Sequence, residues 1–160
     1  MSGPTGAPKP TGDAMDEERS RKNIERMRKV IEVMPFTRHL GMELVDASEG
    51  RARVRLPYRT EISTAGDAVH GGAIASLIDT TGAMAAWTTA EIATPKYFGS
   101  TIGVNVNYLS GAIGEDIFAE GRILKRGKEI IYTDVHVTNA EGKLLAQGSV
   151  VYRIVEKGGE

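Results

Sequence analysis

Hydrophobic and polar residues alternate with period two along several segments of the chain. In residues 51–58, Ala52, Val54, Leu56 and Tyr58 lie on one side and three arginines on the other. Such alternation is typical of a strand with one buried face. Further strands are predicted at residues 102–108, 117–125, 129–138 and 144–155. Short turns with glycine separate the last three, which predicts a meander of antiparallel neighbours.

Two other segments follow helical spacing. Residues 16–34 carry apolar side chains every three or four positions, from Ile24 to Met34, and Pro35 follows. This pattern predicts an amphipathic helix that ends at the proline. Residues 70–90 are apolar almost all round, which predicts a buried helix. The expected fold is therefore α+β, with a long central helix wrapped by a mostly antiparallel sheet of five or six strands.

Composition narrows the possible classes of protein. The chain has 160 residues with 20 basic and 21 acidic side chains, a net charge of −1, which leaves no basic footprint for nucleic acid. It has no cysteine, so disulfides and thiolate metal sites are excluded. We find neither a membrane span nor a secretory signal and expect a cytoplasmic protein.

We expect three parts along the chain. Residues 1–14 are rich in glycine and proline and are predicted to be a disordered tail. Residues 15–35 form the N-terminal helix. Residues 36–156 form a single domain of ordinary size.

The start of the buried helix carries candidate chemistry. It opens with His70-Gly71-Gly72, and Asp79 follows in its apolar middle. A helix N-terminus offers unpaired N–H groups that stabilise an oxyanion, and glycines let a ligand approach them. A carboxylate inside an apolar helix is costly unless it is hydrogen-bonded, so Asp79 is either a satisfied structural residue or a functional one.

Helix geometry keeps these two features apart within one chain. His70 and Asp79 are nine residues apart, which corresponds to about 180° of rotation and roughly 13.5 Å of rise. They would share a site only if a second copy of the helix lay antiparallel beside the first. A two-fold dimer provides that arrangement and creates two equivalent sites.

The spacing of these residues is similar to a known signature. The HGG sequence at 70–72, followed after six residues by Asp79, resembles the helix of hotdog-fold acyl-CoA thioesterases, closest to the phenylacetate-degradation (PaaI-type) family. Gly66 and the strand at 101–110 (TIGVNVNYLS) also match the family pattern. The resemblance extends over residues 41–152. It implies the hotdog fold and hydrolysis of an acyl- or aryl-CoA thioester.

The resemblance also implies roles for individual residues. Asp79 would be the general base or the nucleophile, and the Gly71 N–H would polarise the thioester carbonyl from the facing subunit. His70 would orient the loop or the substrate. Thr101 would help to position the water or the acid. The family commonly has Asn six positions before the histidine, where this chain has Thr64, a departure that bears on the rate and the detailed mechanism.

The substrate is expected to lie between two subunits. Its expected binding residues are Gly72, Thr80, Val104 and Asn105, with the helix face around Leu77, Thr81 and Met84. A basic cluster at a turn between strands would bind the nucleotide of coenzyme A; its members are Lys125, Arg126 and Lys128. A solvated hairpin tip explains this cluster equally well.

Two other functions remain open at this point. One is a non-catalytic acyl-CoA sensor, favoured by Thr64. The other is a hotdog hydratase, which would need an Asp/His pair that we do not find. A carboxylate with a helix N-terminus requires no metal or cofactor. We expect a homodimer, or a homotetramer built as a dimer of dimers, that acts on an aromatic or an aliphatic acyl-CoA.

Overall fold

A computed structural model of the chain describes residues 12–90 and 96–157. Its helices are α1 (Gly12–Val33), α2 (Pro35–Leu40), the short 3-10 helix η1 (Thr60–Ile62) and α3 (Gly71–Trp87). Its strands are β1 (Glu43–Ser48), β2 (Arg51–Leu56), β3 (Tyr97–Tyr108), β4 (Ile117–Arg126), β5 (Ile130–Asn139) and β6 (Leu144–Glu156).

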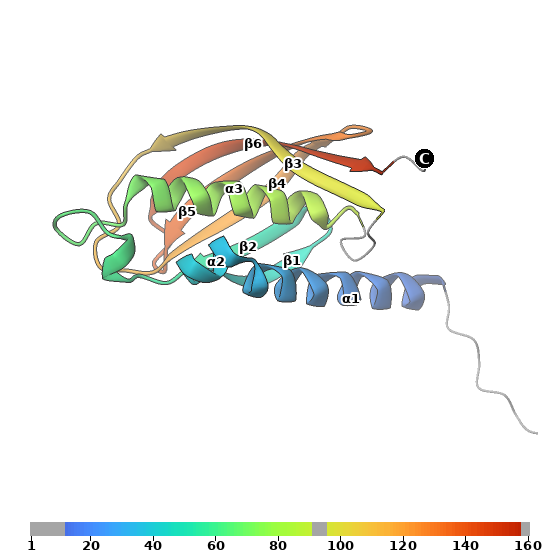
Figure 1. Ribbon diagram of the computed structural model, residues 1–160, viewed down its shortest axis with the longest axis horizontal. Helices are drawn as coiled ribbons and strands as arrows, with labels where there is room; N and C mark the ends of the chain where they lie inside the picture. The colour runs from blue at the N-terminus through green and yellow to red at the C-terminus, as the bar shows by residue number, and fades with distance from the viewer. Residues whose placement is uncertain (1–11, 91–95, 158–160) are drawn as a thin grey trace, which may run out of the picture.

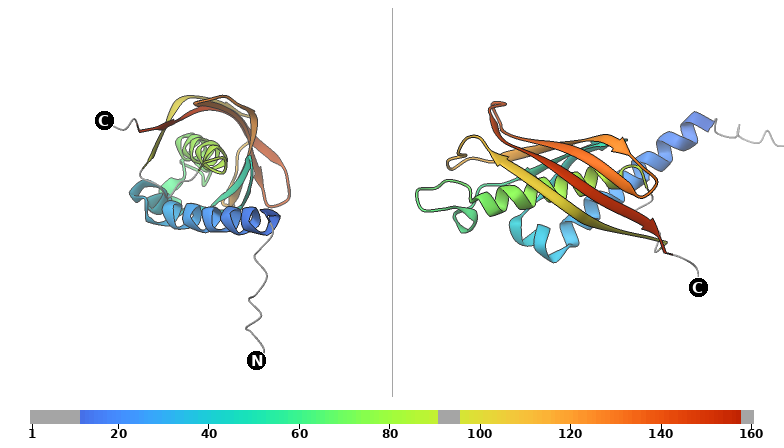
Figure 2. Two further views of the ribbon diagram at one scale, coloured as in Figure 1. Left: turned by 90° about the vertical axis from the view of Figure 1, so that its right-hand side faces the viewer. Right: turned by 90° about the horizontal axis from the view of Figure 1, so that it is seen from above.

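Within the described residues, six strands form one sheet in the order β1-β2-β4-β5-β6-β3. Every neighbouring pair is antiparallel. The sheet curves around α3, which lies along its concave side (Figures 1 and 2). The predicted α+β architecture, a long central helix wrapped by an antiparallel sheet, is confirmed.

The helix α3 packs tightly against the sheet because small residues meet it. Leu77 and Ile78 have no exposed surface, and burying such a side chain contributes about 1.5–3 kcal/mol. A Cβ at Gly82 would lie 2.6 Å from Val150, and one at Gly148 would lie 2.6 Å from Ile78. Glycine at these two positions therefore sets the distance between helix and sheet.

The N-terminal helix is amphipathic, as predicted. Met27 and Ile31 are fully buried in the same core cluster as α3. The helix begins at Gly12, within the segment 1–14 that we predicted as a tail, and the rest of that segment lies outside the described residues. Pro35 does end α1 but also begins α2, because proline is favoured in the first turn of a helix.

The two edges of the sheet have different surroundings. Beside β1 lies α1 (Figure 1). Arg28 Nε on α1 donates a hydrogen bond to the Leu44 carbonyl at 3.4 Å. The other edge, β3, carries exposed apolar side chains, with Phe98 and Ile102 each 56% exposed and Val104 42% exposed. Among the described residues, the β3 edge is thus apolar and not covered by another element.

The prediction missed one strand and misplaced one end of each of two others by two residues or more. We did not predict β1, because a bulge between Leu44 and Asp46 interrupts its alternation. Strand β2 ends at Leu56, two residues early, since Pro57 has no N–H for the ladder. Strand β3 begins at Tyr97, five residues before the predicted start.

A bulge in β3 also corrects its predicted apolar face. The pairing with β6 shifts between Thr101 and Gly103, so Ile102 is the extra residue. As a result Thr101 and Val106, five positions apart, both face α3: Thr101 bonds to Asp79, and Val106 packs against the core. Ile102 does not share that face as we had predicted.

Candidate active site

The first turn of α3 has one backbone N–H left over. His70 is the N-cap residue, with extended backbone, and its Nδ1 accepts a hydrogen bond from the Gly72 N–H at 2.9 Å. The Ala73 and Ile74 N–H groups donate to the His70 carbonyl. Among the hydrogen bonds of the described residues, none uses the Gly71 N–H. This group is therefore able to donate to a ligand.

Asp79 lies two turns further along α3 and is half-buried. Thr101 Oγ1, on β3, donates a hydrogen bond to Asp79 Oδ1 at 2.7 Å. A carboxylate has two oxygens and about four acceptor positions, so one hydroxyl fixes its orientation and leaves it able to accept a proton. The structure thus brings two of the predicted site residues, Asp79 and Thr101, into contact.

Tyr108, the last residue of β3, positions Gly71. Its hydroxyl donates to the Gly71 carbonyl at 3.0 Å, and a Cβ at Gly71 would lie 3.4 Å from the tyrosine ring. We had not assigned a role to Tyr108, although it belongs to the strand pattern at 101–110 that carried the resemblance. Strand β3 therefore contacts both ends of the candidate site, through Thr101 and through Tyr108.

Within one chain the two ends stay apart. Gly71 and Asp79 are eight residues apart in one helix, a rise of about 12 Å. A stripe of half-buried or exposed residues joins them along the face of α3 that its own sheet leaves open. Its members are Gly72, Ala75, Ser76, Asp79, Thr80, Ala83 and Trp87. We call this face the open stripe of α3.

Comparison with known proteins identifies the family. The model of the Thioesterase superfamily matches residues 66–146, which is 81 of the 160 residues. Human acyl-coenzyme A thioesterase 13 is 37% identical over 131 residues, covering 78% of this chain and 91% of the human protein. The chain belongs to the thioesterase superfamily.

Solved structures agree with this thioesterase fold. The zebrafish Thioesterase Superfamily Member 2 is 28% identical, with a TM-score of 0.68, covering 86% of this chain and 97% of that one. The Escherichia coli PaaI protein of the phenylacetic acid degradation operon has a TM-score of 0.73 at 20% identity, covering 89% and 96%. The latter likeness concerns the fold alone. The predictions of a hotdog fold and of a thioester hydrolase are confirmed.

The other predicted site residues of this thioesterase occupy different places. Thr64 lies exposed in the loop before α3, where its hydroxyl donates to the Ala65 carbonyl at 3.2 Å. None of its hydrogen bonds within the described chain reaches Asp79 or Gly71. Gly72 and Thr80 lie on the open stripe, and Val104 and Asn105 are exposed on β3.

The helix face that we predicted around Leu77, Thr81 and Met84 is wrong. These three side chains are 0 to 3% exposed and pack into the subunit's own core. The open stripe of α3 lies on a different side of the helix. Of the residues predicted for this face, only Thr80 belongs to the stripe. An almost wholly apolar helix gives little periodicity from which to read its outward face.

The basic cluster lies at the other end of α3 from Gly71. Arg126 Nε donates to Thr89 Oγ1 at 3.1 Å, and its guanidinium also donates to the carbonyls of Gly127 and Lys128. Lys125 and Lys128 are exposed. Within one chain, this cluster is therefore part of the turn between β4 and β5 and does not meet Asp79.

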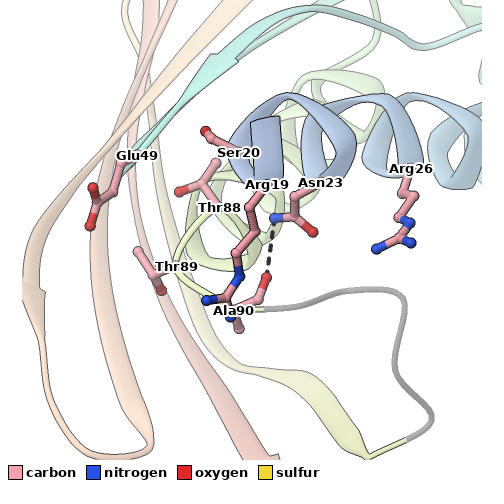
Figure 3. Close-up of a pocket in the computed structure, with 8 residues that line it drawn as sticks. All are labelled: Arg19, Ser20, Asn23, Arg26, Glu49, Thr88, Thr89 and Ala90. Carbon is pink, nitrogen blue, oxygen red and sulfur yellow. Dashed lines mark hydrogen bonds between the residues drawn. The ribbon is translucent and has the colours of Figure 1, made fainter. Parts of the chain in front are cut away.

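A pocket of about 360 Å³ lies between α1 and the C-terminal end of α3. Figure 3 shows the residues that line it. Asn23 Nδ2 donates to the Ala90 carbonyl at 3.1 Å and to the Trp87 carbonyl at 3.3 Å. Residues of α1, Glu49 and residues 88–90 line it, and it contains none of the predicted site residues. We interpret this region as the place where α1 is anchored to α3.

The described residues form neither a metal cluster nor a membrane-spanning helix. No three His, Asp or Glu side chains in this part of the chain gather closely enough to hold a metal ion. No helix in the same residues is both long and apolar enough to cross a membrane.

Proposed function

We propose that this thioesterase hydrolyses acyl- or aryl-coenzyme A thioesters to the free acid and coenzyme A. The observation that carries the proposal is the Asp79 carboxylate, which lies on the open stripe of α3 and is oriented by a hydrogen bond from Thr101 on β3. The unused Gly71 N–H supplies the second element, a donor for the oxyanion. The name of the human relative supports a coenzyme A thioester as the substrate.

The proposed site is shared between two subunits. The exposed β3 edge lies beside the open stripe of α3, since Thr101 on β3 bonds to Asp79 on the stripe (Figure 1). The two together suit an isologous contact with a second copy. If the two α3 helices lie antiparallel with the two-fold axis near Ala75, Gly71 of each lies opposite Asp79 of the other. Ala75 is small enough to let the helices approach closely.

The chemistry follows from these groups. A water oxygen attacks the thioester carbon while Asp79 takes its proton, and the Gly71 N–H stabilises the negative charge on the carbonyl oxygen. The C–S bond then breaks, and the coenzyme A thiolate takes up the proton. Direct attack by Asp79 on the thioester carbon would expel the coenzyme A thiolate and form a mixed anhydride, which water would hydrolyse to the free acid and the Asp79 carboxylate; this route uses the same oxyanion donor. Since neither route uses a metal, EDTA should leave turnover unchanged.

Asp79→Asn tests the proposal. Against a panel of short, medium, long and aromatic acyl-CoAs, we expect kcat to fall about 10²- to 10⁴-fold, the usual contribution of a general base. Release of free thiol measures turnover, and circular dichroism checks the fold. Asp46→Asn, at an exposed position on β1, is the matched control and should retain wild-type kcat. Full turnover in Asp79→Asn would contradict the catalytic assignment.

A second candidate function is a non-catalytic acyl-CoA sensor. It is favoured by Thr64, whose hydroxyl is engaged with the Ala65 carbonyl within its own loop. Binding of acyl-CoA by the wild-type protein, without release of thiol from any member of the panel, would favour the sensor.

Light scattering tests the proposed assembly, with an expected mass of two or four times the 17.2 kDa chain.

A further inference from the structure

We infer that Trp87 and Tyr152 close the far end of the acyl pocket and limit the length of the acyl group. This inference rests on the proposed function, because it assumes that the thioester carbon is held at Asp79. It concerns a different part of the site, the continuation of the open stripe from Asp79 towards the C-terminal end of α3.

The two residues fill the space between α3 and β3 just beyond Asp79. On β3, Gly99 is two positions before Thr101 and therefore on the same face of the strand. A Cβ at Gly99 would lie 2.7 Å from the Trp87 ring and 2.8 Å from Tyr152. Both rings thus press against the backbone of β3, one strand period from the residue that orients Asp79.

The wall formed by these two rings is held in place by hydrogen bonds and packing. Trp87 Nε1 donates to the Tyr152 hydroxyl at 3.0 Å, and the ring centroids are 6.4 Å apart at 66°. Tyr152 is only 7% exposed and packs with Ile131 and Ile154. Burial raises the pKa of Tyr152, and the nearby charge of Asp79 acts in the same direction, so the phenol stays neutral. The Asn23 side chain holds the Trp87 backbone from the other side.

The stretch between Asp79 and Trp87 is suited to an apolar chain. Ala83, one turn after Asp79, is half-buried and small, so it leaves room beside the helix. In the proposed dimer, the partner's α3 begins opposite Asp79, so this stretch extends beyond the partner's helix. An acyl group whose carbonyl lies at Asp79 therefore has space past Ala83 and meets an aromatic wall at Trp87.

Helix geometry gives the approximate length of this space. The eight residues from Asp79 to Trp87 correspond to a rise of about 12 Å. An extended acyl chain advances by roughly 1.3 Å per carbon, given C–C bonds of about 1.5 Å. The space accommodates about eight carbons or one aromatic ring. The inferred substrates are short- to medium-chain acyl-CoAs and aryl-CoAs with a single ring.

The test is a chain-length profile of kcat/KM on saturated acyl-CoAs from two to sixteen carbons. For the wild type we expect kcat/KM to fall at least about tenfold between eight and twelve carbons, because a longer chain meets the Trp87 ring and cannot keep its carbonyl at Asp79. Trp87→Ala should move this fall to chains at least four carbons longer. Trp87→Leu, which keeps an apolar side chain, should move it less and serves if Trp87→Ala does not fold. Phe36→Ala, at an exposed position on α2, is the control and should leave the profile unchanged.

A binding measurement gives a readout besides turnover. Trp87 is the single tryptophan of the chain, so intrinsic fluorescence reports on the proposed wall. Titrating Asp79→Asn with octanoyl-CoA should change the emission, whereas acetyl-CoA and free coenzyme A should leave it unchanged. A folded Trp87 variant with the wild-type profile would overturn this inference and leave the proposed function standing. A wild-type protein that hydrolyses no acyl-CoA would instead overturn the proposed function.

Discussion

The two ends of α3 differ in how their terminal backbone groups are hydrogen-bonded. At the C-terminal end, Thr88 and Thr89 hydroxyls donate to the carbonyls of Ala85 and Ala86 at 2.6 and 2.8 Å. Asn23, from α1, donates to the Trp87 carbonyl. At the N-terminal end, His70 accepts from Gly72, while the Gly71 N–H has no acceptor within the described chain.

This difference separates the tasks of the backbone groups at the two ends of one helix. Backbone carbonyls that are fully bonded contribute only to the fold, since they need no further partner, whatever the side chains beside them do. A helix end with an N–H group that lacks an acceptor, beside glycines that let a ligand come close, keeps that donor available to a ligand. Substitutions at the two ends should accordingly affect different measurements.

Of the two ends of α3, the N-terminal end is expected to show the larger effect. Gly71→Pro removes the N–H that we assign to the oxyanion, and proline suits the first position of a helix. His70 already has φ −63° and ψ 137°, as a residue before proline prefers. We expect kcat to fall about 10²- to 10³-fold, as when an oxyanion donor is lost. Thiol release measures kcat, and thermal unfolding checks stability.

Gly71→Ala is the matched control for this change. It keeps the N–H, and its Cβ would make ordinary contact with the Tyr108 ring at 3.4 Å, so most activity should remain. Mixing Gly71→Pro with Asp79→Asn tests the shared site. A mixed dimer contains one site with both residues intact, so activity should reappear after the two inactive variants are unfolded and refolded together. Equal loss in Gly71→Ala and Gly71→Pro would show that the N–H is not the important group.

A smaller effect, on stability, is expected at the C-terminal end. Asn23→Ala removes two hydrogen bonds to the carbonyls of Trp87 and Ala90, which should lower the free energy of unfolding by about 1–2 kcal/mol. Urea denaturation measures this change. Arg21→Ala, at an exposed position of the same helix, is the control. A loss of kcat comparable to that of Gly71→Pro would contradict the division between the two ends.

The smallest effect is expected for Tyr108→Phe. It removes the hydrogen bond to the Gly71 carbonyl but keeps the ring against Gly71. A single neutral hydrogen bond contributes about 0.5–1.5 kcal/mol, so kcat/KM should fall roughly two- to tenfold. The unfolding midpoint in urea should change little, because the hydroxyl is at an exposed position. If kcat/KM were unchanged, Tyr108 would have no positioning role.

Most of the strands, the helix α3 and the main candidate site residues could be predicted from the sequence. Period-two alternation predicted five of the strands, and the apolar run predicted α3 with the HGG opening and Asp79. Thr101 was placed near Asp79 by resemblance, and the hydrogen bond between them confirms that they meet. The catalytic roles of these residues stay predictions.

Other features could not be predicted because they depend on tertiary contacts. The bulges in β1 and β3 interrupt alternation, so β1 was missed and Ile102 was assigned to the wrong face. Trp87 and Tyr152 are 65 positions apart, and only the folding of β6 against α3 brings their rings together. The open stripe of α3 could not be predicted either, because several of its residues are as apolar as those on the buried side of the helix.

The unequal edges of the sheet bear on how large an assembly can become. A sheet with two open edges can add copies at both and grow into a filament. In the described sheet, α1 lies beside β1 and bonds the Leu44 carbonyl through Arg28, whereas β3 is uncovered. In the proposed dimer, pairing through β3 would use the open edge of both copies and leave none for a third. The N-terminal helix, which lies beside the opposite edge, would thereby limit edge pairing to two copies and prevent open-ended growth.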